Sequence, residues 1–248
     1  MDSCEQTRNR SSNCPVSRAS IFRIRTSLFR FRRLPGRTPF APVVKDIYHL
    51  SVRHGWVYIY DSPPASSRLD ELVEHLARDG INLGDPGTGK VIRVSPVGDQ
   101  ILSSREDIRA ECVTSSRVNF NFYFAPSDNV FCSVRTIQSD VVCESFALDG
   151  KSEEQSFRVI DDLIQLFSKR AAKGLAFGFV ADRYAELHQH FHWDDFFIGK
   201  TPTPPEWPIV LGCSDNFSKL KVVPTDVYTR TQPGPNCNLF RLTDTISG

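Results

Sequence analysis

The sequence lacks the long apolar runs and paired-cysteine motifs that identify several classes of protein. Among its 248 residues no apolar run approaches the roughly 18 consecutive residues of a membrane-spanning helix. We also find no apolar core of a secretory signal ahead of a small-residue cleavage site. The seven cysteines are an odd number without a C-x-x-C pair, so we interpret them as reduced thiols rather than a disulfide framework. These absences favour a cytoplasmic protein.

The sequence also lacks an intact catalytic motif. It has no G-x-S-x-G elbow and no H-E-x-x-H pair, and no cysteine lies in a recognisable nucleophile context. The segment 84–90, GDPGTGK, matches a phosphate-binding loop as far as Lys90, but Val91 replaces the hydroxyl residue that holds magnesium. Because residues 91–94 favour a strand where such a loop needs a helix, we interpret this segment as a turn-forming loop.

Charge is distributed unevenly along the chain. Residues 1–45 hold nine arginines and one lysine against Asp2 and Glu5, a net charge of +8, so the total of +1 leaves −7 for residues 46–248. We predict that residues 1–42 form a basic, disordered N-terminal extension and that residues 43–248 form a single domain with an irregular Pro/Thr-rich C-terminal tail. The extension could be an organellar transit peptide, a nucleic-acid-binding arm, a membrane-surface segment or an extension without a selected role.

The stretch from residue 117 to residue 182 predicts the central part of the fold. In residues 118–124 large apolar side chains alternate with polar ones, which is the period of a half-buried strand. Residues 130–137 and 141–148 are rich in β-branched and aromatic residues and follow short polar connections. These three segments together predict a three-stranded antiparallel meander.

A helix and a further strand are expected after this meander. Ser152 and Gln155 match a capping box, and the apolar residues that follow recur at helical spacing until Gly174. The short apolar run 175–181 favours a strand that returns to the sheet and is covered on both faces. Upstream, we expect a hairpin of residues 47–53 and 56–60, a second principal helix after Ser67, and a short helix over residues 104–112. The sequence therefore predicts an α+β domain with a mainly antiparallel sheet and two principal helices.

The segment 188–195, HQHFHWDD, is the one dense cluster of potential metal ligands. On a strand, His188, His190 and His192 would share one face, with Asp194 nearby, and could bind zinc or iron. On a helix only His188 and His192 would align. A polar and aromatic surface segment with solvated histidines is the simpler interpretation of the same residues.

Aromatic and acidic residues gather in the segment 193–207. These residues would pack the end of the domain or form an exposed surface suited to a protein partner, because aromatic side chains dominate interface energies. The candidate partner-binding residues are Trp193, Asp194, Asp195, Phe196, Glu206 and Trp207.

The features above favour binding without catalysis. We predict a non-catalytic protein-binding module, such as an inhibitor, an immunity-type protein or an adaptor, with an unidentified partner. One alternative is a metal-dependent hydrolase or oxygenase that uses the 188–195 cluster. A second alternative is nucleic-acid binding through the basic extension, since the acidic remainder of the chain would repel phosphate. A transit-peptide role for residues 1–42 would make the protein organellar.

Overall fold

The computed structural model describes most of the chain beyond residue 54. All described residues belong to one compact unit, Pro42–Gly248. The predicted extension, residues 1–42, lies outside the described residues, so its boundary and its role stay predictions. None of the described helices has the length and apolar character needed to cross a lipid bilayer. The described residues are 55–62, 68–138, 141–182, 191–201, 203–204, 207–217, 221 and 223–242.

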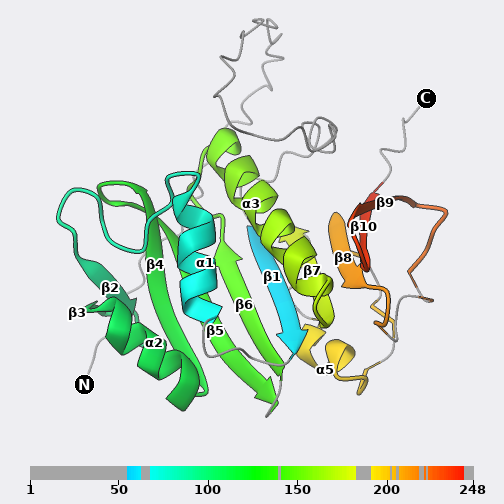
Figure 1. Ribbon diagram of the computed structural model, residues 1–248, viewed down its shortest axis with the longest axis horizontal. Coiled ribbons are helices and arrows are strands. Elements are labelled where there is room, and N and C mark those ends of the chain that lie inside the picture. The colour runs from blue at the N-terminus through cyan, green and yellow to red at the C-terminus, as the bar shows by residue number, and fades with distance from the viewer. Residues whose placement is uncertain are drawn as a thin grey trace, which may run out of the picture. The chain divides into compact units, whose positions relative to one another are not determined.

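One antiparallel sheet forms the centre of the described structure (Figure 1). In the described part of the chain it has ten strands, in the order β3-β2-β4-β5-β6-β1-β7-β8-β10-β9. The strands are β1 (Gly55–Ser62), β2 (Val91–Val94), β3 (Gln100–Ser103), β4 (Arg117–Ala125), β5 (Asp128–Gln138), β6 (Val141–Ala147), β7 (Leu175–Asp182), β8 (Val210–Ser214), β9 (Tyr228–Gly234) and β10 (Cys237–Leu242).

Three of the four described helices lie on the same face of this sheet, as Figure 1 shows. They are α1 (Arg68–Ala77), α2 (Arg105–Thr114) and α3 (Glu153–Ala171), and the fourth, α5, is the short helix Trp193–Phe197. Capping boxes start two of them: Ser104 accepts from Asp107 N at 3.1 Å, and Ser152 from Gln155 N at 3.2 Å. The predicted start of the long helix at Ser152 is therefore confirmed, and each cap satisfies an N–H that the helix itself leaves unpaired.

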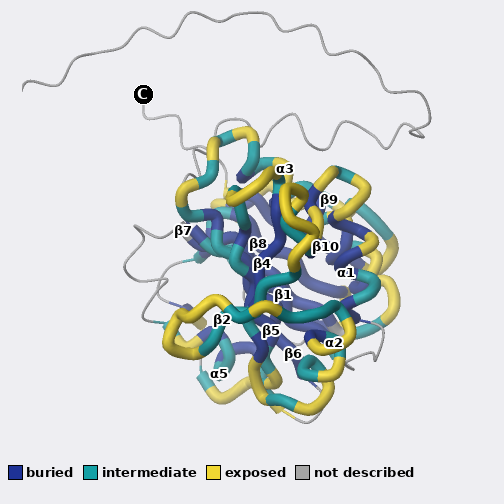
Figure 2. Tube along the Cα trace, turned by 90° about the vertical axis from the view of Figure 1, so that its left-hand side faces the viewer, coloured by how far each residue is buried: buried dark blue, intermediate teal, exposed yellow. Residues whose placement is uncertain are grey.

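The alternation of side chains along the strands produces two cores. On the helix side, Val57, Ile59, Phe120, Leu72 and Leu163 belong to one buried cluster that joins the strands to α1 and α3. The opposite side of β1, β7 and β8 carries a second, largely aromatic cluster. Figure 2 shows that the strands are mostly buried, whereas the loops are exposed. The second cluster contains Tyr60, Phe177, Phe179, Trp193, Phe196, Phe197, Leu211, Phe217 and Phe240.

Two glycines let α3 approach the sheet closely. A Cβ added to Gly212 in β8 would lie 2.6 Å from Cε1 of Phe167, and a Cβ added to Gly178 in β7 would lie 3.3 Å from its Cδ2. The Phe167 ring therefore rests on bare backbone, because any larger residue would collide with it.

The predicted α+β class and mainly antiparallel sheet are confirmed, but the extent of the sheet was underestimated. The predicted meander exists as β4, β5 and β6, within a sheet of ten strands in the described part of the chain. The first strand of the predicted hairpin, residues 47–53, lies outside the described residues. The second forms as part of β1, which pairs with β6 along one edge and with β7 along the other, so segments distant in sequence take both edges.

Candidate functional site

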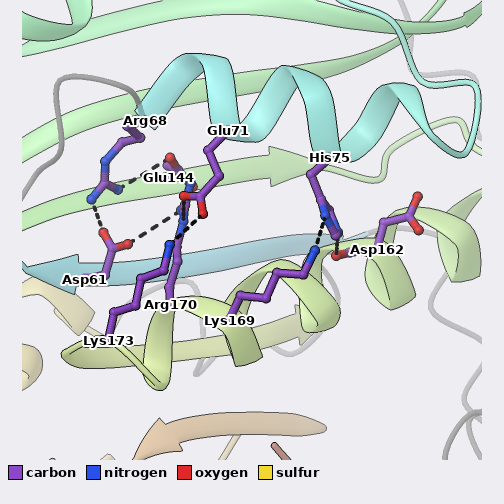
Figure 3. A network of polar contacts seen from close by, with 9 residues as sticks. All are labelled: Asp61, Arg68, Glu71, His75, Glu144, Asp162, Lys169, Arg170 and Lys173. Carbon is purple, nitrogen blue, oxygen red and sulfur yellow. Dashed lines mark hydrogen bonds and ion pairs between the residues drawn. The ribbon is translucent and has the colours of Figure 1, made fainter. Parts of the chain in front are cut away.

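A network of buried charges lies between the helices and the sheet (Figure 3). Glu144 in β6 is fully buried and accepts hydrogen bonds from Arg170 at 2.5 Å and from Arg68 at 3.4 Å. Arg68 also pairs with Asp61, and Arg170 donates to Glu71 at 3.1 Å. Two arginines and three carboxylates thus connect α1 and α3 to β1 and β6. Burial raises the pKa of Asp61, although the two arginines oppose this rise.

The pairing and burial of this charge network indicate a structural rather than a catalytic role. Each of its carboxylates bonds at least one guanidinium, which compensates for the loss of solvation on burial. The side chains of Arg68, Arg170 and Glu144 are at most 8% exposed, so a substrate in solvent does not reach them. We therefore place the candidate functional surface elsewhere.

A second polar group on the helix side contains the titratable residues His75, Lys169 and Asp162. His75 contacts the backbone oxygen of Asp162 through Nε2 at 2.7 Å, and Lys169 Nζ lies 3.2 Å from its Nδ1 (Figure 3). Lys169 donates to Nδ1, so Nε2 carries the hydrogen that is donated to Asp162. Burial lowers the pKa of His75. Burial, with the nearby carboxylate of Asp79, raises the pKa of Asp162 to about 9.

The other face of the sheet is only partly covered. The largely aromatic cluster beneath α5 extends past β1 to Val141 and Cys143 of β6, and no described helix lies over the adjoining part of β6, β5 and β4 on this side (Figure 1). A depression of about 520 Å³ lies there, between β1 and the loop that connects β2 to β3. We call this surface the open face, and define it by Trp56, Tyr58, Arg117, Asn119, Phe131, Ser133, Arg135 and Ser145.

A second depression adjoins the open face at α5. It has a volume of about 320 Å³ and is lined by Tyr58, Tyr60, Arg135 and residues 191–195. Because Tyr58 and Arg135 line both depressions, the two are continuous. Burial raises the pKa of Tyr58 to about 12, so its hydroxyl stays protonated and can donate a hydrogen bond at neutral pH.

Arg135 connects α5 to the sheet through Asp194. Its two Nη atoms bond both carboxylate oxygens of Asp194, with Nη2 to Oδ1 at 2.7 Å. The hydroxyl of Tyr60 donates to the same Oδ1 at 2.7 Å. Burial acts to lower the pKa of Arg135, but the groups around it raise that pKa overall, and the carboxylate of Asp194 bonds both Nη atoms, so the guanidinium stays charged. We call these three residues the clamp, and it fixes α5 over β1.

The structure describes two of the four predicted metal ligands. His192 is exposed, and Asp194 is engaged in the clamp. Within the described ranges no three His, Cys, Asp or Glu side chains are grouped so that they could hold a metal ion. His188 and His190 lie outside the described residues, so the zinc or iron site stays a prediction.

The predicted partner-binding residues divide between core and surface. Trp193 and Phe196 are buried, and Phe177 packs against both. Trp207 is half-buried, with its ring edge against Phe196 at 6.0 Å between centroids. Asp194 and Asp195 are half-buried and line the depression beside α5, while Glu206 lies outside the described residues. An exposed aromatic patch is thus not formed by Trp193 and Phe196, and partner binding by the segment stays a prediction.

The residues of the open face were not identified from the sequence. The alternation of side chains along β5 did carry a signal for them. Val130, Cys132 and Val134 lie on one face of this strand, so Phe131, Ser133 and Arg135 must lie on the other. The missing information was which strands lie side by side.

Comparison with known proteins gives no assignment for this arrangement. No protein-family model matches the sequence, and no curated protein matches it either.

Proposed function

We propose that this chain is a non-catalytic module that binds a protein partner through the open face. One observation carries the proposal: aromatic, arginine and amide side chains gather on a part of the sheet that no described helix covers. Tryptophan, tyrosine and arginine are the residues most often responsible for binding energy at protein interfaces. Asp194 and Asp195, predicted from the sequence, lie at the border of this surface.

The chemistry of the described side chains also favours binding over catalysis. Burial raises the pKa values of Cys112, Cys143 and Cys213 to about 12, which disfavours a nucleophilic thiolate at neutral pH. The buried carboxylates Glu144 and Asp61 are held by arginines on the covered side of the sheet. An inhibitor, an immunity-type protein or an adaptor would use such a surface. The metal-dependent and nucleic-acid-binding alternatives both depend on residues outside the described part.

Phe131 provides the test of this proposal. Its ring contacts Trp56 at 6.0 Å between centroids, and the residue is half-buried on the open face. The full-length protein, immobilised, would be used to capture partners, and each captured protein would be purified and titrated against wild type and Phe131→Ala. We expect a partner whose dissociation constant rises at least tenfold in this variant, since central aromatic truncations cost about 2 kcal/mol or more.

Val113 provides the matched control. This residue is 68% exposed on α2, on the helix-covered side of the sheet. Val113→Ala should leave the affinity unchanged. A partner that loses affinity equally in both variants, or in neither, would contradict binding through the open face.

A further inference from the structure

The strand register arranges the open face into three rows that run across the strands. In the first row Trp56 lies opposite Ala147 in β6, and Phe131 contacts the Trp56 ring. In the middle row the small polar residues Ser145 and Ser133 lie opposite each other, and Tyr58 lies at the β1 end of the row, opposite Ser145. The third row pairs Arg135 with Arg117. The middle row is therefore the floor of a trough, with an aromatic wall on one side and a guanidinium wall on the other.

The dimensions of the trough follow from the geometry of the sheet. Phe131 and Arg135 are four residues apart on one strand, which places their Cα atoms about 13 Å apart. Allowing about 3 Å for each wall leaves a gap about 7 Å wide, which is the distance between residues i and i+2 on one side of an extended chain. Across the strands, the distance from β4 to β1 is about 14 Å. This space accommodates a short extended segment.

Of the two arginines in the guanidinium wall, Arg135 alone pairs with a carboxylate of the described residues. Arg117 and Arg135 lie directly opposite each other on adjacent strands, an arrangement that is unfavourable for like charges. Asp194 bonds both Nη atoms of Arg135 and neutralises it. Among the described residues, no carboxylate pairs with Arg117, and Asp195 lines the depression beside α5 rather than the trough. A carboxylate beside Arg117 would relieve the repulsion between the two arginines.

The aromatic wall suits an apolar side chain. Trp56 and Phe131 meet edge to face, with 84° between their planes, and both remain half-buried. At the end of the trough the β2–β3 turn adds Pro96, and the neighbouring Val97 is 84% exposed. A ligand that covers these groups removes apolar surface from water, which stabilises the complex by about 25 cal/mol for each Å² buried.

We infer that the trough takes an extended segment of a partner protein in which an aspartate or glutamate lies two residues from an aromatic or aliphatic residue. The carboxylate pairs with Arg117, the apolar side chain packs on Trp56 and Phe131, and Ser133, Ser145 and Asn119 offer hydrogen bonds between them. This inference rests on the proposed function and specifies the chemistry of the partner. A polyanion fits less well, because only one guanidinium lacks a described carboxylate.

Capped tripeptides test the inference without the natural partner. The full-length protein, labelled with ¹⁵N, would be titrated by NMR with acetyl-Phe-Ser-Glu-amide and with acetyl-Phe-Ser-Gln-amide. We expect the first peptide to shift the indole resonance of Trp56 and the amides of Phe131 and Ser133. The second should bind about fivefold more weakly, because an ion pair at a partly exposed site contributes up to about 1 kcal/mol.

Arg117→Gln should remove the difference in affinity between the two peptides. Arg93→Gln is its matched control, since Arg93 lies on β2, pairs with Glu111 at 2.6 Å on the other face and should leave the difference intact. Equal affinity of the two peptides for the wild type would overturn the inference, as would the absence of shifts at millimolar peptide. Shifts that grow with protein concentration alone would also overturn it and identify a second copy of this chain as the occupant. None of these results would contradict the proposed function, which the Phe131→Ala experiment tests separately.

Discussion

The two faces of the sheet use polar side chains in opposite ways. β6 places Glu144 on the covered face, where it is fully buried and bonds two arginines, and places the neighbouring Ser145 on the open face. On the covered face the charges of this network hold α1 and α3 to the sheet. The open face has Arg117, which pairs with no described carboxylate, together with serine and asparagine groups able to bond a ligand. Strand alternation thus builds a rigid interior and a recognition surface from the same strands.

The largest expected effect comes from breaking the charge network on the covered face. Arg170→Ala would leave the fully buried Glu144 with Arg68 alone, at 3.4 Å, and would leave Glu71 without a guanidinium partner. We expect the free energy of unfolding to fall by about 3–5 kcal/mol, because a buried carboxylate that loses its closest partner keeps its desolvation cost. Urea unfolding followed by circular dichroism would measure this loss.

Arg117→Ala is the matched control on the open face and should change the free energy of unfolding by less than about 0.5 kcal/mol. If Arg170→Ala is too unstable to purify, Arg170→Lys keeps the charge and should still cost more than the control. Equal losses of stability in Arg170→Ala and Arg117→Ala would contradict the difference between the two faces.

A pH-dependent effect is expected from Asp162, also on the covered face. Its folded pKa of about 9 lies above the ordinary value of 3.8, so the unfolded state loses its proton first as the pH rises. Stability therefore falls between about pH 4 and pH 9. Asp162→Asn removes this titration and should stabilise the fold by several kcal/mol at pH 8, with no gain near pH 4.

Melting temperatures of wild type and Asp162→Asn across this pH range would measure the difference. The neighbouring Asp161 is exposed to solvent more than Asp162, so Asp161→Asn serves as the control and should show no comparable trend. A constant difference at all pH values would argue that the variant acts through packing.

A third effect concerns how closely the covered face can be packed. Gly212→Ala would place a Cβ 2.6 Å from the Phe167 ring, closer than a side chain can be accommodated without movement. Overpacking of this kind costs about 1–3 kcal/mol, and thermal denaturation would measure it. The double variant with Phe167→Leu should recover part of the loss, and an additive double variant would contradict the contact.

The smallest effect is expected at the clamp. Asp194→Asn removes the charge that faces Arg135, whose side chain is 21% exposed, and should cost about 1 kcal/mol because solvent screens a partly exposed pair. Urea unfolding at low and high salt would show a smaller difference at high salt. Asp195→Asn, at the adjacent position, is the control, and an equal loss there would contradict a specific role for the clamp.

Local elements of the fold could be predicted from the sequence because their signals are local. The alternation in residues 118–124 and the capping box at Ser152 act within a few residues, and both elements form as expected. The strand order could not be predicted, because β1 takes its neighbours from β6 and β7 rather than from the adjacent segment. Periodicity reports which face of a strand is apolar, but not which strand lies beside it.

The candidate site was harder to predict than the fold. Composition drew attention to the aromatic and acidic segment 193–207, yet its Trp193 and Phe196 are buried. Residue type alone does not distinguish a core aromatic from a surface one. The open face instead draws one to three residues from each of four strands, and none of these strands is unusual by itself. Pairs such as Arg117 and Arg135 become a feature only when the register is known.

The position of β1 has a consequence for the time course of folding. β1 is made first among the described strands, but Asp61 pairs with Val142 and Ser62 with Leu175. Ribosomes add about 5–20 residues per second, so the 120 residues between Ser62 and Asp182 take roughly 6–24 s to synthesise. β1 lacks β6 until Ala147 has been made and lacks β7 for the whole interval, so its aromatic side chains Trp56, Tyr58 and Tyr60 remain open to contact with other chains. We expect newly made protein to be most prone to aggregation at this stage, before the sheet closes around its earliest strand.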